Sequence, residues 1–262
     1  MTDLDPLLRD LTAEGDELDA LVRDLPADEW RRPTPAAGWT IATQIAHLAW
    51  SDEVATTAAV DPAAFAEIAA RVSADPGAVD RAAAAHADGE PAELLTSWRG
   101  GRVALRSTLA AVTPGTKLPW FGPSMGPATM ATARLMETWA HGQDVADALG
   151  VARLPTVRLR HVAYLGIRTR DWSFRVHGRP APTQPIRVEL SAPADETWEF
   201  GPADADQRVT GPALDFALLI TQRRHRDDLG LVATGAAADA WLDVAQAFAG
   251  PAGPGRARSR SS

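Results

Sequence analysis

The chain has 262 residues, of which 45% are hydrophobic and 23% are charged. This length favours one or two domains, and the composition is that of a protein with a hydrophobic core, which excludes a globally disordered chain, a collagen-like repeat and a coiled-coil rod. The 26 basic and 34 acidic residues give a net charge of -8. Proteins that bind duplex nucleic acid normally carry a basic excess, so no nucleic-acid partner is expected.

The sequence contains no cysteine. Disulfides, thiolate metal ligands, iron–sulfur clusters and a cysteine nucleophile are therefore excluded, and any transition metal must be held by histidine and carboxylate side chains. No apolar run reaches the ~18–20 residues that span a bilayer. The acidic segment 1–10 also lacks the basic and apolar regions of a signal peptide. We therefore expect a cytoplasmic protein without a membrane partner.

The first two-thirds of the chain is predicted to be helical, because leucines, valines and isoleucines recur there at steps of three and four residues. Thr40 is the predicted N-cap of one helix, Pro62 and Pro91 suit the first turns of two others, and Gly150 suits a helix end. The expected helices cover residues 4–22, 41–59, 62–86 with a break at 75–77, 91–113, 128–149 and 156–170.

The pattern changes after about residue 178. Alternating apolar and charged residues predict a hairpin of strands over 186–190 and 196–200. The expected elements that follow are strands over 207–210 and 231–234 and helices over 212–222 and 236–249. We therefore expect an α+β protein with an up-down bundle of four or five helices over 1–178, a small α/β module over 184–250 and a disordered tail over 251–262.

One pair of residues has the spacing of a metal site. Glu137 and His141 are four residues apart on a predicted helix, so they project from the same face. His47 lies in the apolar segment 45–49, where an unpaired polar ring is costly, and it is the candidate third ligand. Two imidazoles and a carboxylate suit zinc above all, and also nickel, iron, manganese or cobalt, with open positions typical of a catalytic site. The spacing alone also fits three ordinary structural residues.

Four segments resemble the mycothiol-dependent maleylpyruvate isomerase family, which belongs to the DinB/YfiT-like metal-binding four-helix bundles. They are LPADEW at 25–30, PAAGWTI at 35–41, IAHLA at 45–49 and RLMETWAHGQD at 134–144. The resemblance covers most of 1–175 and continues more weakly into 185–250, where the family carries a small α/β module resembling sterol-carrier proteins. It implies that His47, Glu137 and His141 are zinc ligands and that the source is actinobacterial.

The resemblance also implies that an arginine of the C-terminal module serves the site, and Arg223 matches it best. An arginine there would neutralise a substrate carboxylate, since its guanidinium binds carboxylates in a bidentate manner. This chain has Gln222 where the family usually has a glycine, and a second arginine follows. The alternative is that the basic cluster is a solvated helix end.

Three further groups have two interpretations each. Asp144 either accepts the second ring N–H of a metal-bound histidine or is an ordinary carboxylate, exposed on the helix or in a salt bridge. Arg134 either contacts substrate or forms a local ion pair. The aromatic loop with Trp120, Phe121 and Met125 either walls an apolar substrate pocket above the metal or caps the bundle.

An open metal site acts as a Lewis acid or lowers the pKa of a bound thiol or water. Because the chain has no cysteine, a thiolate must come from a low-molecular-weight cofactor, and the resemblance implies mycothiol. The resulting expectation is an isomerase or S-transferase that adds the thiolate to an activated small molecule, as a monomer or homodimer. The alternatives are a thiol-independent metalloenzyme of small-molecule metabolism and a non-catalytic metal-binding module.

Overall fold

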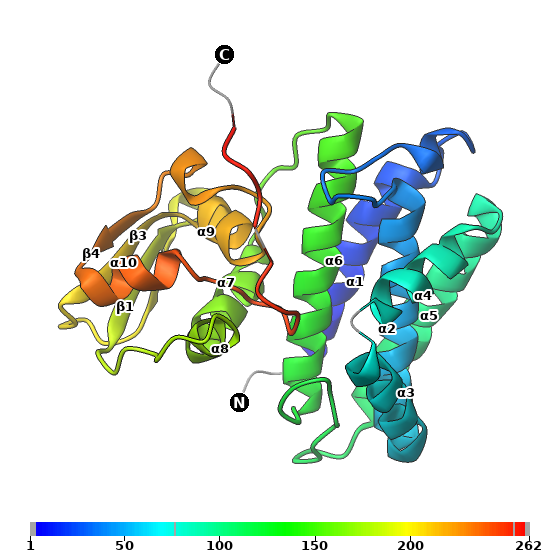
Figure 1. Ribbon diagram of the computed structural model, residues 1–262, viewed down its shortest axis with the longest axis horizontal. Coiled ribbons are helices and arrows are strands. Elements are labelled where there is room, and N and C mark those ends of the chain that lie inside the picture. Colours follow the sequence, from blue (N-terminus) through cyan, green and yellow to red (C-terminus); the bar gives the residue numbers. More distant parts are fainter. Residues whose placement is uncertain (1–3, 76, 254, 260–262) are drawn as a thin grey trace. The chain divides into compact units, whose positions relative to one another are not determined.

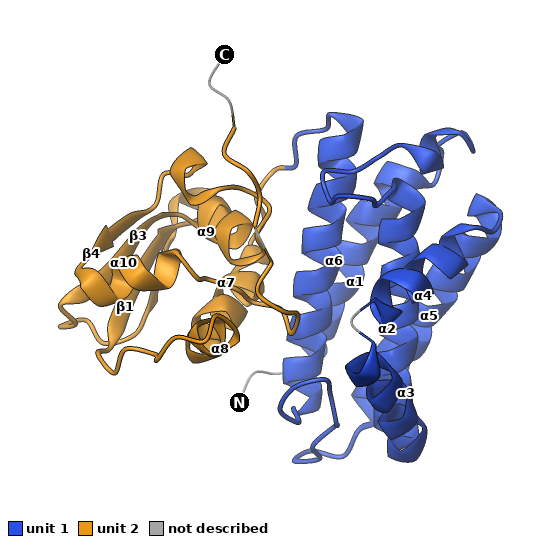
Figure 2. Cartoon of the chain, viewed as in Figure 1, with its two compact units in different colours: residues 1–153 blue, residues 154–262 orange. Residues whose placement is uncertain are grey.

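A computed structural model describes residues 4–75, 77–253 and 255–259. The chain forms two compact units, Met1–Arg153 and Leu154–Ser262 (Figure 2). The first unit is helical, and the second combines helices with one sheet, so the expected α+β class is confirmed. The sequence analysis expected the bundle to end at residue 178, but the two units divide between Arg153 and Leu154. The fifth long helix of the expected bundle is therefore part of the second unit.

Among the described residues of the first unit, four helices are long, and Figure 1 shows how they lie together. They are α1 (Leu4–Val22), α2 (Ile41–Val60), α5 (Pro91–Ala111) and α6 (Pro127–Leu149). Helix α2 packs against α5 and α6, and α1 packs against α6 and α5. Two shorter helices, α3 (Pro62–Ala74) and α4 (Ala78–Ala87), pack against α2 and replace the single expected helix at its predicted break. Pro76, in that break, lies outside the described residues.

Local sequence signals explain where these helices begin and end. The Thr40 hydroxyl accepts a hydrogen bond from the Thr43 N–H at 3.2 Å, which caps α2. Pro62 and Pro91 occupy first turns, where the missing N–H costs nothing. Gly150 ends α6 in a left-handed conformation with φ 68°. The predicted helices of the first unit are confirmed at these positions.

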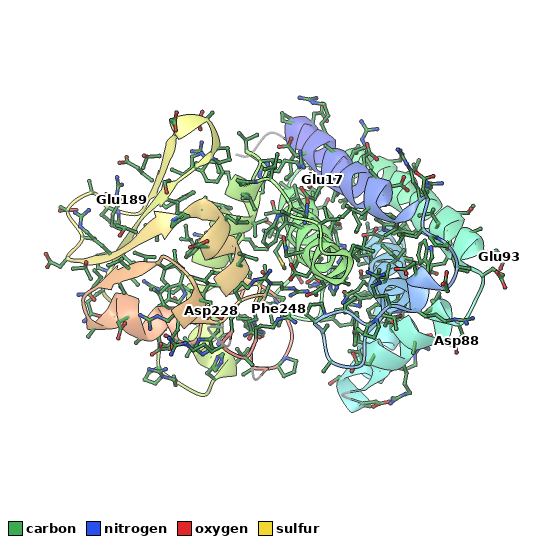
Figure 3. All side chains as sticks on the ribbon, turned by 90° about the horizontal axis from the view of Figure 1, so that it is seen from above. Glu17, Asp88, Glu93, Glu189, Asp228 and Phe248 are labelled. Carbon is green, nitrogen blue, oxygen red and sulfur yellow. The ribbon has the colours of Figure 1, made fainter. Side chains whose placement is uncertain are left out.

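A buried ion pair fastens the end of α6 to α1. Arg153 pairs with Glu14 and Glu17 of α1, and its Nη1 donates to the Trp139 carbonyl at 2.9 Å. Glu14 is buried, and Figure 3 labels Glu17 on the same helix. A charge buried in this way is tolerated because each partner is hydrogen-bonded.

Among the described residues, none of the helices combines the length and apolar character that crossing a membrane requires.

The second unit is a four-stranded sheet with helices. Its strands are β1 (Ile186–Ser191), β2 (Thr197–Phe200), β3 (Gln207–Pro212) and β4 (Val232–Thr234), in the order β2-β1-β3-β4. Strand β1 pairs antiparallel with β2 and parallel with β3, and β4 closes the other edge antiparallel to β3. Glu189, labelled in Figure 3, pairs with Arg187 and Arg208 on the partly exposed face of the sheet.

The helices of this unit differ most from the sequence prediction. They are α7 (Leu159–Arg168), α8 (Arg170–Val176), α9 (Ala213–Ile220) and α10 (Ala236–Leu242). The expected helix over 156–170 begins later, and the chain leaves helical geometry at Thr169. Helix α10 stops at Leu242 instead of 249. The N–H groups of Gln246 and Ala247 donate to Ser173 Oγ and the Ile220 carbonyl, so they are not available to extend α10.

A glycine lets α7 approach α9 closely. A Cβ at Gly166 would lie 2.3 Å from Cδ1 and 3.2 Å from Cβ of Ile220, a side chain that is completely buried. We expect Gly166→Ala to lower the free energy of unfolding by ~1–3 kcal/mol, because overpacking outweighs the gain of about 1 kcal/mol in helix propensity. Urea unfolding measures this difference.

Gly101→Ala is the matched control, because nothing lies within 4 Å of a Cβ at this position on α5. It should raise stability by up to about 1 kcal/mol. Equal stabilisation by both substitutions would show that the α7–α9 contact is looser than described.

Candidate metal centre

Three potential ligands from α2 and α6 converge on one point inside the first unit. His47 lies on α2, and Glu137 and His141 lie one turn apart on α6. The Nε2 atoms of His141 and His47 lie 3.2 Å and 3.7 Å from Glu137 Oε2. One ligand atom of each residue lies within 4.8 Å of the other two, and no other such group of three occurs among the described residues. The structure thus brings together the three residues chosen from the sequence.

The electrostatics of the site favour an ionised carboxylate. Burial alone would raise the pKa of Glu137, but hydrogen bonds with His141 and His47 outweigh it. The nearby positive charge of Arg134 adds to this effect, and the pKa lies well below its usual range. Glu137 therefore presents an anionic oxygen between two imidazoles, which is a suitable donor set for a divalent cation.

A glutamine orients His141. Nδ1 of His141 donates a hydrogen bond to Oε1 of Gln44, so Nε2 is the nitrogen that faces Glu137. When Nε2 carries a proton it donates to the carboxylate, and when that proton is lost its lone pair is available to a cation. The Gln44 amide is itself fixed, because its Nε2 donates to the Thr34 hydroxyl at 2.8 Å. That hydroxyl in turn donates to the Trp39 carbonyl at 3.0 Å. This chain of hydrogen bonds fixes the histidine tautomer in the way that outer partners of metal-bound histidines usually do.

The loop before α2 supplies a wall for the site. Gly38 turns the chain with φ 79°, a conformation that glycine adopts without strain. The indole of the next residue, Trp39, lies with its centroid 5.3 Å from the His47 ring and 5.7 Å from the His141 ring. The Gly-Trp-Thr motif therefore has three physical roles: a turn, a ring against both histidines and the N-cap of α2.

The sequence analysis gave Asp144 as one candidate for the outer partner of a metal-bound histidine and missed Gln44. Gln44 Oε1 accepts from His141 Nδ1, and Asp144 is a buried side chain on the same helix as His141, whose role beside the metal ligands stays a prediction. The signal that singled out His47 also applied to Gln44. Both are polar residues in the apolar first half of α2, where an unpaired polar group is costly.

Arg134 is a correction to the sequence analysis. It forms an ion pair, but with Asp52 of α2 instead of a neighbour on its own helix, and Nε lies 2.9 Å from Asp52 Oδ1. Only 1% of Arg134 is exposed, and a contact of this side chain with substrate stays a prediction. The pKa of Asp52 is raised by burial, although the adjacent Arg134 opposes this shift. Arg134 thus acts on the site through its charge.

The aromatic loop with Trp120, Phe121 and Met125 packs on the bundle, which is what the second of its two interpretations expected. Leu118 and Met125 exchange backbone hydrogen bonds of 2.8 Å and 3.0 Å, which makes the loop a tight hairpin. Trp120 and Phe121 pack against Phe65 of α3, with centroids 5.9 Å and 5.4 Å away.

The same aromatic row continues toward the metal ligands. The Phe121 ring lies 6.3 Å from Trp50, which lies 6.1 Å from His47. A substrate contact by Trp120, Phe121 or Met125 stays a prediction.

Arg223 belongs to the second unit, directly after α9. The preceding Gln222 has φ 58°, a left-handed conformation, and the Arg223 N–H closes the helix end on the Leu218 carbonyl at 2.8 Å. This geometry explains why a glycine suits position 222, since a left-handed residue without Cβ avoids strain. Gln222 therefore keeps the left-handed turn that a glycine would make, although its side chain makes this conformation less favourable. A role of Arg223 in the metal site stays a prediction.

The Gln44 contact generates a direct test. We expect Gln44→Leu to weaken zinc binding by about 10- to 100-fold, because His141 loses the acceptor that fixes its tautomer. Competition with a chromophoric chelator measures the affinity. Gln143→Leu is the matched control: Gln143 is also buried, but it donates to Asp147 and not to a candidate ligand. Equal affinities for the two variants would remove Gln44 from the site.

Comparison with known proteins identifies the family. Residues 11–146 match the family model described as the mycothiol maleylpyruvate isomerase N-terminal domain, a span that includes His47, Glu137 and His141. Two proteins of Mycobacterium tuberculosis, the uncharacterized protein MT0041 of strain CDC 1551 and the uncharacterized protein Rv0036c of strain H37Rv, are each 58% identical over 257 residues. Those residues are 98% of this chain and 100% of each relative.

Solved structures share the fold. The crystal structure of the mycothiol-dependent maleylpyruvate isomerase is 15% identical, with a TM-score of 0.60 over 88% of this chain and 92% of that chain. A histidine-to-alanine mutant of that isomerase matches with 16% identity, the same TM-score and the same coverage. At these identities the match shows the fold, whereas the family model, which covers more than half of the chain, shows the family. The chain belongs to the mycothiol maleylpyruvate isomerase family, as its sequence motifs implied.

Proposed function

We propose that the protein is a divalent-metal-dependent enzyme that acts on a small molecule with the help of a low-molecular-weight thiol. The observation that carries this proposal is the convergence of His47, Glu137 and His141 within 4.8 Å of one another. Membership in a family named for a mycothiol-dependent isomerase supports the thiol and the reaction class. The finer proposal is an isomerase or S-transferase that uses mycothiol.

The donor atoms fit zinc or another first-row metal. Two imidazole nitrogens and one carboxylate oxygen are its usual protein ligands, and three protein ligands leave positions open for other molecules. His47 presents Nε2 to Glu137, while its Nδ1 is buried without a hydrogen-bond partner among the described residues. A divalent metal held there supplies Lewis acidity, which lowers the pKa of a bound thiol or polarises a carbonyl group.

The side chains around the three ligands have distinct roles in this proposal. Gln44 holds the Nδ1 proton of His141 and so keeps Nε2 free to bind a cation. The indole of Trp39 lies against the rings of both histidines and helps to hold them in place. Because the chain has no cysteine, the sulfur nucleophile must be supplied by a separate molecule. We assign the substrate carboxylate to Arg223, on the basis of the family resemblance and the affinity of guanidinium for carboxylates.

The ligand assignment predicts the metal content of variants. His47→Ala and His141→Ala should each lose stoichiometric zinc by elemental analysis, while their helical content by circular dichroism stays unchanged, because the bundle is held by its apolar core. His86→Ala is the control, since His86 is an exposed residue of α4, away from the three candidate ligands in sequence, and its Nδ1 hydrogen-bonds the Ala82 carbonyl. Stoichiometric zinc in either site variant would refute the assignment.

The thiol proposal is tested by calorimetry with mycothiol. Titration of the zinc-loaded protein should release about one proton per thiol bound, because a thiol must ionise to ligate the metal. Proton release is read from the dependence of the binding heat on the ionisation enthalpy of the buffer. S-methylated mycothiol is the control, and it should bind without proton release.

Each outcome of this titration separates the candidate functions. Mycothiol binding that is unaffected by chelation would contradict a metal-dependent thiol enzyme. The absence of mycothiol binding, with zinc still bound, would favour the thiol-independent metalloenzyme. A chelated protein that keeps its melting temperature, with no small-molecule binding in either form, would favour a non-catalytic metal-binding module.

A further inference from the structure

A cavity opens between α2, α3 and α4 of the first unit, three helices that pack against one another (Figure 1). Its volume of about 690 Å³ falls in the range of about 300–1,000 Å³ that is typical of small-molecule sites. None of the three candidate metal ligands lines it. Trp50 forms part of its wall, and the centroid of the Trp50 ring lies 6.1 Å from that of His47. The cavity is therefore a neighbour of the metal centre and not a part of it.

Much of the cavity wall is apolar. Val54 of α2 is only 2% exposed, and Trp50 and Ile68 pack against the hydrophobic cluster to which it belongs. Helix α4 contributes no large apolar residue to the lining, only Ala78 and Ala82. These small side chains leave the space between the helices open instead of filling it, as the close packing of protein interiors would require. A ligand with an apolar group gains free energy by transferring that group from water to this wall.

Three of the polar side chains on the lining are engaged within the protein. Asp75 pairs with Arg81, and its Oδ1 also accepts a hydrogen bond from the Gly77 N–H at 3.0 Å. The Nδ1 of His86 donates to the Ala82 carbonyl at 2.8 Å. These contacts lie within α4 and the turn that precedes it. They therefore have a structural explanation that needs no ligand.

Arg71 and Glu53 differ from these residues. Both line the cavity, and among the described residues neither side chain forms an ion pair or a hydrogen bond, with the other or with a third residue. Arg71 lies in the last turn of α3 and Glu53 lies on α2, so a cation and an anion reach the cavity from two different helices. A ligand with one negative and one positive group can pair with both of them.

We propose that this cavity binds a free α-amino acid with an apolar side chain. The carboxylate of the amino acid pairs with the Arg71 guanidinium, which matches its planar shape, and the ammonium group pairs with the Glu53 carboxylate. The apolar side chain rests on Trp50 and Val54, and an aromatic ring suits this wall because it can stack on the indole. A ligand with two carboxylates would instead bring a like charge toward Glu53. Occupancy of the cavity does not depend on a bound metal, because no metal ligand lines it.

The test uses L-tryptophan as the probe and compares it with two analogues that each lack one charge. Indole-3-propionate keeps the carboxylate, and tryptamine keeps the ammonium group. Binding to the full chain at neutral pH is followed by isothermal titration calorimetry and by ¹H–¹⁵N chemical-shift perturbation, with and without zinc. Arg71→Gln and Glu53→Gln remove the two charges at exposed positions, where folding tolerates the change. Arg9→Gln and Glu67→Gln are the matched controls, because both residues are exposed and neither lines the cavity.

We expect L-tryptophan to bind the parent protein more tightly than either analogue and to shift amide signals of residues 50–57, 68–74 and 78–86. Arg71→Gln should weaken the binding of L-tryptophan and indole-3-propionate by about 3- to 10-fold without weakening that of tryptamine. Glu53→Gln should weaken L-tryptophan and tryptamine by a similar factor without weakening indole-3-propionate. Both control variants should bind all three compounds as the parent does.

A third variant tests the place of binding. Ala82→Phe fills the cavity from α4 and should weaken L-tryptophan binding by about tenfold or more, whereas Ala84→Phe, at an exposed position of the same helix, should not. Absence of L-tryptophan binding to the parent would overturn the proposal, as would unchanged binding by Ala82→Phe. Equal or tighter binding of one analogue would overturn the assigned ligand class. Binding that requires zinc would place the ligand at the metal centre and so contradict a separate site.

Discussion

The hydrogen bond between His141 and Gln44 is the contact on which the metal centre depends. It joins α6 to α2 at the level where His47 and Glu137 also meet, and it leaves Nε2 of His141 facing Glu137. Gln44 can perform this role because Thr34 holds its amide in one orientation. The loop that carries Thr34 also places Trp39 over both histidines. A short segment before α2 thus organises ligands on two helices.

A second polar contact, the buried pair of Arg134 and Asp52, joins the same two helices. Burying two charges is expensive, and such pairs are better at fixing the register of two helices than at stabilising them. Here the register matters, because a shift of α6 along α2 would separate Glu137 from His47. The charge of Arg134 also helps to keep the pKa of Glu137 low, so that the carboxylate stays ionised between the imidazoles.

The sequence was sufficient where a single residue type decides the local structure. Thr40, Pro91 and Gly150 set helix ends through capping and backbone geometry, and the spacing of Glu137 and His141 placed both on one face of α6. Residues whose role depends on a distant partner were harder. Nothing near Arg134 in the sequence indicates Asp52, and α10 is shortened by acceptors on α8 and α9. Likewise, the unit boundary depends on α7 packing against α9, which hydrophobic periodicity does not encode.

X-ray absorption at the zinc K edge of the zinc-loaded protein tests the central claim most directly, because it reads the ligand atoms themselves. The account predicts a first shell of nitrogen and oxygen donors at about 2.0–2.2 Å, with the outer-shell scattering of two imidazole rings. After addition of mycothiol, one sulfur at about 2.3 Å should appear. A shell with fewer than two imidazoles would contradict the assignment of His47 and His141 as ligands of a single metal ion.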